Sequence, residues 1–120
     1  MRTNDYPTLV FGYSPNEERY SNKAALLLNE FHHPVVTFNL RENKIEDLSK
    51  LVIENTMHTV TMYVNPELSQ KYFANLIALP VKRFIFNPGT ENEALIKGLQ
   101  ENKKEVVIGC TLVMLKTDQF

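Results

Sequence analysis

Residues 59–66 read Thr-Val-Thr-Met-Tyr-Val-Asn-Pro, and this stretch decides the fold. Residues 59–64 are all β-branched, aromatic or apolar, which is typical of a strand that is buried on both faces. Asn65 is a typical helix N-cap and Pro66 fits the first helical position, so the strand passes directly into a helix. A doubly buried strand followed by a helix is the repeating unit of a parallel sheet with helices on both faces.

The same unit recurs along the rest of the chain. Further strands are predicted at 8–11, 35–38, 83–86 and 106–108. Helices are predicted at 22–31 with Ser21 as N-cap, at 45–54, from Pro66 through Leu79, and at 92–100, and a last apolar segment, 112–115, packs back on the sheet. The order strand, helix, strand predicts an α/β fold with a mainly parallel five-stranded sheet, in which 8–11 is a central strand.

Composition narrows the class of protein. A chain of 120 residues fits one domain, 1–120, and its formal charge of -1 with interspersed acids and bases gives no electrostatic footprint for nucleic acid. One cysteine excludes an internal disulfide, and no apolar run is long enough to cross a membrane or direct secretion. A cytoplasmic protein with a small-molecule ligand is the simplest expectation.

The predicted strands end in small, polar or Gly/Asn residues, and ligands of parallel sheets bind at these carboxyl ends. The loop after the first strand has a single glycine, Gly12, in place of the G-x-G-x-x-G pattern of dinucleotide sites. The second strand ends in Asn39-Leu40-Arg41, where plain NAD sites carry an acid. Asn39 and Arg41 favour a ligand whose ribose carries a phosphate, a condition that both coenzyme A and NADP satisfy.

Two groups of residues suggest where that ligand would be held. Arg19, Ser21 and Lys23 gather at the start of the first helix, where backbone amides favour an anion. Solvated charges and a helix cap explain these three residues equally well. The run 87–92 reads Asn-Pro-Gly-Thr-Glu-Asn and its Gly89 allows a close ligand approach, although turns and caps alone also explain such residues.

Four long motifs resemble the small bacterial CoA-binding proteins, a family similar in fold to the first domain of the succinyl-CoA synthetase alpha subunit. The motifs are Ser-Pro-Asn-x-x-Arg-Tyr-Ser-x-Lys-Ala at 14–24, Thr-Val-Thr-Met-Tyr-Val-Asn-Pro-Glu at 59–67, Phe-Ile-Phe-Asn-Pro-Gly-Thr-Glu-Asn at 84–92 and Cys-Thr-Leu-Val-Met-Leu at 110–115. The resemblance implies a Rossmann-like three-layer sandwich that binds coenzyme A, an acyl-CoA or a related adenine nucleotide.

The resemblance also implies roles for individual residues. By motif, the phosphates would be held by Gly12, Ser14, Arg19, Ser21 and Lys23, and the ribose phosphate by Asn39 and Arg41. The adenine and ribose side would be lined by Tyr63, Val64 and Asn65, and the pantetheine direction by Asn87, Pro88, Gly89 and Glu91. The family usually has alanine at the position of Tyr13, so this ring is expected to narrow the phosphate loop or to stack on a ligand.

Catalysis is not expected. Cys110 follows the last strand, where a single cysteine is more often a small buried hydrophobe than a reactive thiol. No histidine pair has metal-ligand spacing, and no Cys-His or Ser-His-Asp order is present, so no metal site or catalytic residue is predicted. The resemblance implies no synthetase activity, because the phosphohistidine of that enzyme belongs to a later domain.

Two alternatives to a non-catalytic CoA-binding module stay open from the sequence. One is a small NADP-dependent oxidoreductase, for which only Tyr63 or Tyr13 could donate a proton. The other is a degenerate Rossmann domain that binds protein, including a homodimer formed through the apolar C-terminal segment or an edge strand.

Overall fold

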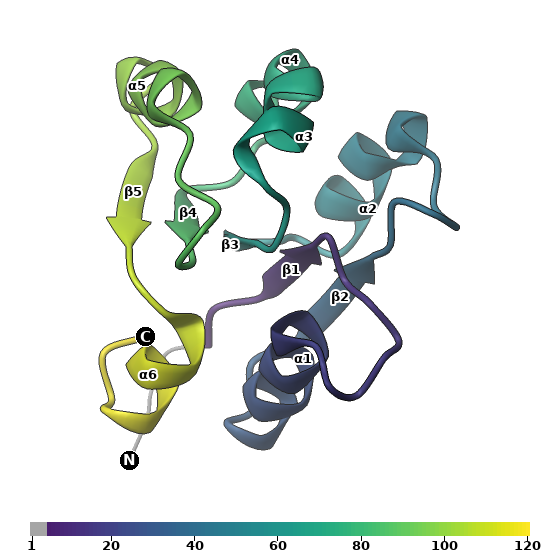
Figure 1. Cartoon of the computed structure of the whole chain (residues 1–120), viewed down its shortest axis with the longest axis vertical. Coiled ribbons are helices and arrows are strands. Elements are labelled where there is room, and N and C mark those ends of the chain that lie inside the picture. Colours follow the sequence, from purple (N-terminus) through teal and green to yellow (C-terminus); the bar gives the residue numbers. More distant parts are fainter. Residues whose placement is uncertain (1–4) are drawn as a thin grey trace.

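Five parallel strands form one sheet in the computed structural model, which describes residues 5–120 (Figure 1). The strands are β1 (Thr8–Phe11), β2 (Val35–Phe38), β3 (Thr59–Met62), β4 (Arg83–Phe86) and β5 (Glu105–Ile108). Their order across the sheet is β2-β1-β3-β4-β5, and every neighbouring pair is parallel. The predicted α/β fold and the central position of the first strand are both confirmed.

Helices cover both faces of the sheet. They are α1 (Tyr20–Glu30), η1 (Ile45–Asp47, a 3₁₀ turn), α2 (Leu48–Glu54), α3 (Pro66–Lys71), α4 (Phe73–Ile77), α5 (Glu93–Glu101) and α6 (Thr111–Lys116). Figure 1 shows α2, α3, α4 and α5 on one side of the strands and α1 and α6 on the other. The result is the predicted three-layer sandwich.

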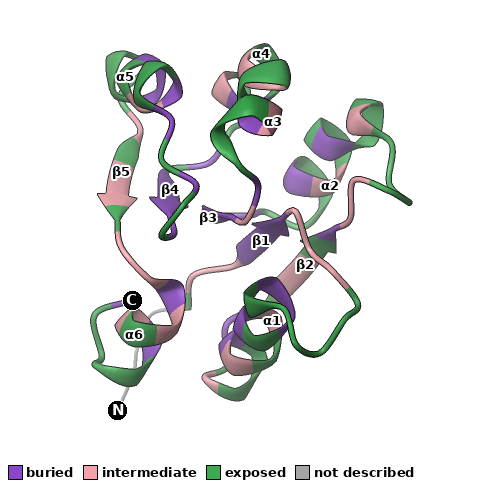
Figure 2. Cartoon of the chain, in the orientation of Figure 1, coloured by how far each residue is buried: buried purple, intermediate pink, exposed green. Residues whose placement is uncertain are grey.

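The core follows from the alternation of side chains along the strands. Leu9, Phe11, Val60 and Met62 point to the face of α2 to α5, where the larger apolar cluster lies, while Val10 and Ile85 join α1, α6 and Phe120 on the opposite face. All four residues of β1, β3 and β4 are buried, whereas the edge strands β2 and β5 are partly exposed (Figure 2).

One charged side chain belongs to this core. Arg83 begins β4 on the α6 face and is only 5% exposed. Its Nε donates to Thr59 Oγ1 at 3.0 Å, and its Nη1 donates to the backbone oxygen of Phe120 at 3.0 Å. The guanidinium lies 4.9 Å from the ring centroid of Tyr6 and 4.5 Å from that of Phe120. Arg83 therefore ties the residue Phe120 to the sheet through cation–π contacts and a hydrogen bond.

Two predicted helix boundaries were wrong. The first helix begins at Tyr20 with Arg19 at the N-cap position, and Ser21 lies inside the helix. Ser21 does not cap the helix because its Oγ accepts a hydrogen bond from the backbone amide of Ser14. The helix predicted from Pro66 through Leu79 is divided into α3 and α4 at Tyr72, whose backbone leaves the helical region at φ -104° and ψ 21°.

Candidate functional site

The connections of the chain reverse direction between β1 and β3, and this switch point is where open parallel sheets bind ligands. Gly12 follows β1 with φ +94°, and a Cβ at this position would lie 2.6 Å from Val64 Cγ1 and 2.8 Å from the carbonyl oxygen of Tyr63. The amides of Gly12 and Tyr13 both donate to the carbonyl of Phe38, each at 3.0 Å. Gly12 is thus required both for the turn and for close contact with the segment after β3.

The loop after Gly12 is held by polar side chains of α1. Ser21 Oγ accepts from the amide of Ser14 at 3.0 Å, and Asn22 Nδ2 donates to the Ser14 carbonyl and to the Tyr13 hydroxyl, each at 3.1 Å. The Tyr13 ring packs with the apolar cluster of α1 and α6. Both the hydroxyl and the ring of Tyr13 therefore contact other parts of the protein on the α1 face of the sheet. Asn22 was missed by sequence reasoning, because nothing in the pattern shows that its amide holds this loop.

The N-terminus of α1 differs from those of α3 and α5. Asn65 and Asn92 cap α3 and α5 by accepting from backbone amides at 2.8 and 3.1 Å. The α1 N-cap residue, Arg19, makes no side-chain cap and the first turn of α1 has no acidic residue. Arg19 and Lys23 are exposed beside this end. The structure therefore brings two cations to a helix N-terminus that lacks a side-chain acceptor, as an anion site needs.

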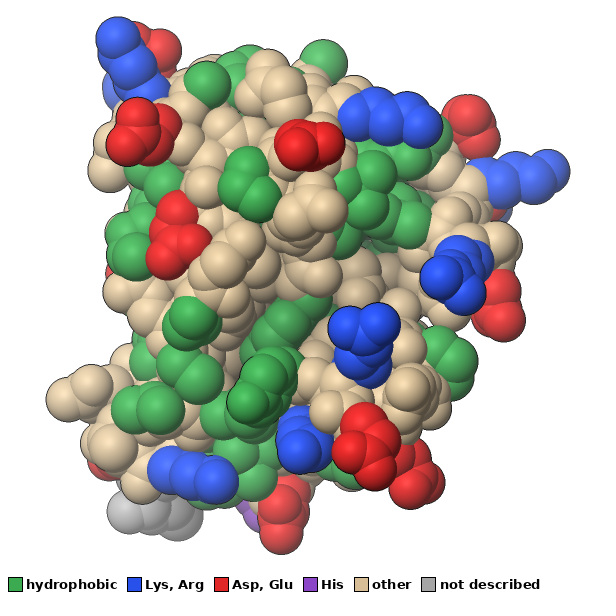
Figure 3. All heavy atoms as spheres, viewed as in Figure 1, with side chains coloured by type: hydrophobic (Ala, Val, Ile, Leu, Met, Phe, Trp, Pro, Cys, Tyr) green, Lys and Arg blue, Asp and Glu red, His purple; other side chains and the backbone are tan. Residues whose placement is uncertain are grey.

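The loop after β2 turns back on itself. Asn39 Oδ1 accepts from the amide of Arg41 at 2.9 Å, and Asn43 Oδ1 accepts from the amide of Asn39 at 2.8 Å. The Asn39 carboxamide oxygen thus serves the turn, while the Arg41 side chain is exposed at the carboxyl end of β2. Figure 3 shows hydrophobic side chains gathered between the helices α2 to α5 on one side and α1 and α6 on the other. Lys and Arg side chains lie beside them, over α1 and α2.

The segment after β3 is more buried than the sequence suggests. Val64 is 6% exposed and belongs to the larger apolar cluster, so its side chain packs in the core. Burial raises the pKa of Tyr63 to about 12, and a hydrogen bond with Thr111 opposes this shift only in part. A hydroxyl with so high a pKa is a weak proton donor near neutral pH. Asn65 is exposed and caps α3.

The polar atoms of the Asn87 side chain are hydrogen-bonded within the protein. It is 3% exposed, its Nδ2 donates to Thr61 Oγ1 at 2.7 Å and to the Met62 carbonyl at 2.8 Å, and its Oδ1 accepts from the Thr111 amide at 2.8 Å. Thr61 Oγ1 and Thr111 Oγ1 are also 2.7 Å apart. This network joins the ends of β3 and β4 to the start of α6, so the side chain of Asn87 acts as a structural brace.

The residues after Asn87 form an open turn. Pro88 and Gly89 are exposed, Gly89 has φ +88°, and nothing lies within 4 Å of where its Cβ would be. The Glu91 carboxylate accepts from the Gly89 amide at 2.8 Å. The carboxyl edge therefore presents this turn on the β4 side and the α1 N-terminus on the β1 side.

The thiol of Cys110 is partly exposed, so the expectation of a small buried hydrophobe was wrong. Cys110 leaves the sheet at the end of β5, which has no strand beyond it among residues 5–120, and this edge position keeps the side chain from being covered. Within residues 5–120, no group of three or more His, Cys, Asp or Glu side chains is arranged to hold a metal ion. No helix in this described range has the length and hydropathy needed to cross a membrane.

Comparison with known proteins agrees with this geometry. The CoA binding domain family matches residues 7–116, which is nearly the whole chain. The chain belongs to the CoA binding domain family. The CoA-binding family predicted from the four motifs is confirmed. A comparison with curated proteins finds no match.

Solved structures similar to this CoA binding domain share its fold. A crystal structure of an uncharacterized protein has 35% identity and a TM-score of 0.84, and the match covers 98% of this chain and all of the other, 100%. A hypothetical protein from Pyrococcus horikoshii OT3 has 23% identity and a TM-score of 0.82, with 96% of this chain and 84% of the other covered. A Thermus thermophilus protein has 17% identity and a TM-score of 0.79, with 97% and 91% covered. The last two similarities bear on the fold alone.

Proposed function

We propose that this CoA binding domain binds coenzyme A or an acyl-CoA at the carboxyl edge of its sheet and catalyses no reaction. The observation that carries the proposal is the N-terminus of α1, which lacks a side-chain cap in a chain that belongs to this family. Its first-turn amides, with Arg19 and Lys23 beside them, suit the pyrophosphate of such a ligand. Gly12 and Ser14 lie in the loop that leads to this end.

The ribose phosphate would meet the exposed guanidinium of Arg41. An arginine presents a planar set of donors to phosphate oxygens, and Arg41 is the basic residue that directly follows β2. Asn39 supports this residue indirectly, because its side chain accepts from the Arg41 amide and fixes the turn.

The remaining parts of the ligand would lie across the switch point. The adenine and its ribose would pass the segment 63–65, and the pantetheine arm would run toward the turn 88–91, where Gly89 leaves the backbone open. The side chains of Val64 and Asn87 shape this surface from inside, since both are buried. Support for a non-catalytic role comes from both candidate proton donors: the raised pKa of Tyr63 makes it a weak donor, and the Tyr13 ring packs against the apolar cluster of α1 and α6.

Calorimetric titration of the nucleotide-free protein with CoA, dephospho-CoA, NADP and NAD tests the proposal. Saturable binding with a preference for CoA is expected. Arg41→Glu should weaken CoA by about tenfold or more and leave dephospho-CoA nearly unchanged, because only CoA carries the ribose phosphate. Lys97→Glu is the matched control, since it makes the same charge change on an exposed position of α5. Equal losses for CoA and dephospho-CoA would refute the role of Arg41, and no heat with any ligand would refute the proposed function.

A further inference from the structure

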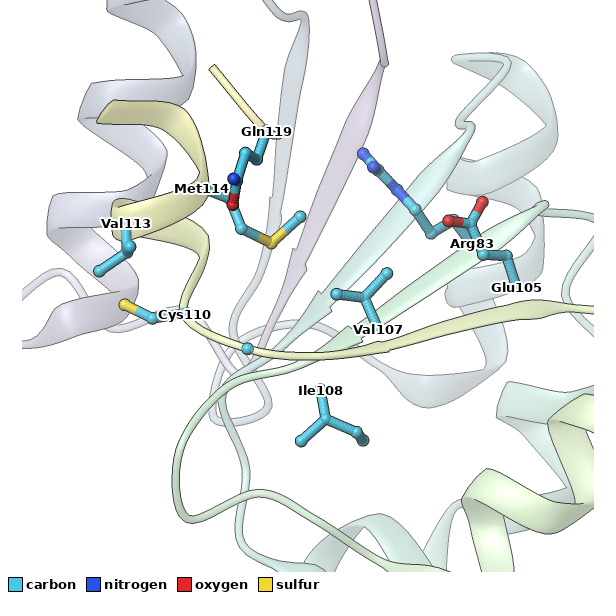
Figure 4. A pocket seen from close by; sticks show the side chains of 9 residues that line it. Arg83, Glu105, Val107, Ile108, Cys110, Val113, Met114 and Gln119 are labelled. Carbon is cyan, nitrogen blue, oxygen red and sulfur yellow. The ribbon is translucent and has the colours of Figure 1, made fainter. Parts of the chain in front are cut away.

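A concave site lies on the α6 face of the sheet, away from the switch point. The groove has a volume of about 390 Å³ and lies between β5 and α6 (Figure 4). Its lining residues are Arg83, Glu105, Val107, Ile108, Gly109, Cys110, Val113, Met114 and Gln119. A groove of this volume is in the range of small-molecule sites.

The groove exists because β5 is an edge strand that α6 does not fully cover. Val107 on the strand and Met114 on the helix are only partly exposed, and both belong to the apolar cluster of the α6 face. In Figure 4, the side chains of Val107 and Met114 point toward the space between the strand and the helix. The middle of the groove is therefore apolar.

One end of the groove holds a buried cation with an unused donor. Arg83 is 5% exposed, and its Nε and Nη1 are hydrogen-bonded, but its Nη2 has no acceptor. A buried donor without an acceptor costs free energy that a ligand oxygen would recover. In Figure 4, the guanidinium points away from the Glu105 carboxylate and lies across the groove from Gln119.

We propose that this groove binds a short apolar chain that ends in a carboxylate, with the carboxylate oxygens on Nη2 of Arg83 and the chain along Val107 and Met114. Nη2 is covered and the guanidinium lies against the rings of Tyr6 and Phe120, so binding includes a displacement of this cover. Glu105 lies at the exposed rim of the groove. Its negative charge opposes the attraction between Arg83 and a carboxylate, but solvent and salt screen this repulsion.

A short apolar chain that ends in a carboxylate could come from two kinds of molecule. One is a free carboxylic acid. The other is the acyl group of an acyl-CoA, which would enter at Gly109 and Cys110, where β5 reaches the carboxyl edge of the sheet. Only this second source rests on the proposed function.

NMR titration of the ¹⁵N-labelled full chain with hexanoate tests the proposal, with hexanol as the uncharged probe. Saturable shifts of the amides of Val107, Gly109, Met114 and Gln119 are expected, with hexanoate bound about tenfold or more tightly than hexanol because its hydrogen bond to the guanidinium is charge-assisted. Equal affinity for the two probes, or no shift of these amides with hexanoate, would overturn the proposal.

Variants give an independent check. Arg83→Gln removes the cation but also an anchor of Phe120, so a loss of folding would make it uninformative by itself. Glu105→Gln keeps both hydrogen bonds and both ring contacts of Arg83 and should tighten hexanoate by about two- to fivefold while leaving hexanol unchanged. A Glu105→Gln protein that binds hexanoate no better than the wild type would contradict the placement of the carboxylate.

A final titration separates the two sources. Glutaryl-CoA carries a terminal carboxylate that butyryl-CoA lacks. Groove shifts with glutaryl-CoA that are absent with butyryl-CoA support the acyl-CoA source, whereas groove shifts with hexanoate alone support the free acid. If hexanoate binds and neither thioester shifts the loop before α1, the proposed function fails while the groove proposal stands.

Discussion

Alanine substitutions at two glycines should separate the cost of an unusual backbone angle from the cost of close packing. Gly12 and Gly89 have nearly the same φ, +94° and +88°. An L-residue in this region costs about 1–2 kcal/mol, and this part applies to both positions. At Gly12 the new methyl group would also lie 2.6 Å from Val64 Cγ1 and 2.8 Å from the Tyr63 carbonyl oxygen, whereas nothing lies within 4 Å at Gly89. Such overpacking adds about 1–3 kcal/mol.

The expected loss of unfolding free energy is therefore about 2–5 kcal/mol for Gly12→Ala and about 1–2 kcal/mol for Gly89→Ala. In urea unfolding followed by circular dichroism, with a slope of about 2 kcal/mol/M, these losses lower the midpoint by about 1–2.5 M and about 0.5–1 M. Since the two substitutions are chemically identical, their difference measures the contact of Gly12 with the segment after β3. Equal midpoints for the two variants would refute the reasoning.

Three further predictions concern Asn87, Phe120 and His58. Asn87→Ala should destabilise the fold by about 2–4 kcal/mol in urea unfolding, because it leaves the buried Thr61 hydroxyl and Thr111 amide short of partners; a loss under about 1 kcal/mol would contradict the bracing role. Phe120→Ala should cost about 3 kcal/mol, since it removes a buried ring from Arg83, and unchanged thermal unfolding would show that this contact contributes little. Burial, and then Arg83 and Lys82, lower the pKa of His58 below its ordinary 6.5. As the pH drops below 6.5, the His58 imidazole therefore takes up a proton in the unfolded chain before it does so in the folded protein. The free energy of unfolding should fall until the pH reaches the folded pKa, and His58→Gln should reduce this fall when unfolding is measured at several pH values.

The sheet could be predicted from the sequence because its central strands are continuous apolar runs. The bounds of β1, β2 and β4 agree with the predicted ranges, and β5 begins one residue earlier than predicted. The predicted third strand was too long, since β3 ends at Met62 and Val64 packs in the core beyond the strand. A run of β-branched and apolar residues indicates burial, but it does not show where the ladder of backbone hydrogen bonds ends.

The helix ends and the site depended on contacts that no local pattern records. Ser21 has the residue type of a cap, yet its hydroxyl serves the amide of Ser14 across the loop. Asn87 has the residue type of a ligand contact, yet the strands and α6 use all of its side chain. Arg83 gave only a weak signal, an arginine at the start of a buried strand, and its role depends on Phe120, 37 residues away. Tertiary partners decided each of these outcomes.

The double use of Asn92 makes the β4 side of the carboxyl edge a rigid platform. Its Oδ1 caps α5, and its Nδ2 donates to Ser69 Oγ and Gln70 Oε1 of α3, at 3.0 and 3.1 Å, so the start of α5 is fastened to α3. The loop before α1 is held instead by Ser21 and Asn22 of its own helix. Little backbone entropy should therefore be lost at the start of α5 when a nucleotide binds, because the β4 side is already ordered as a platform.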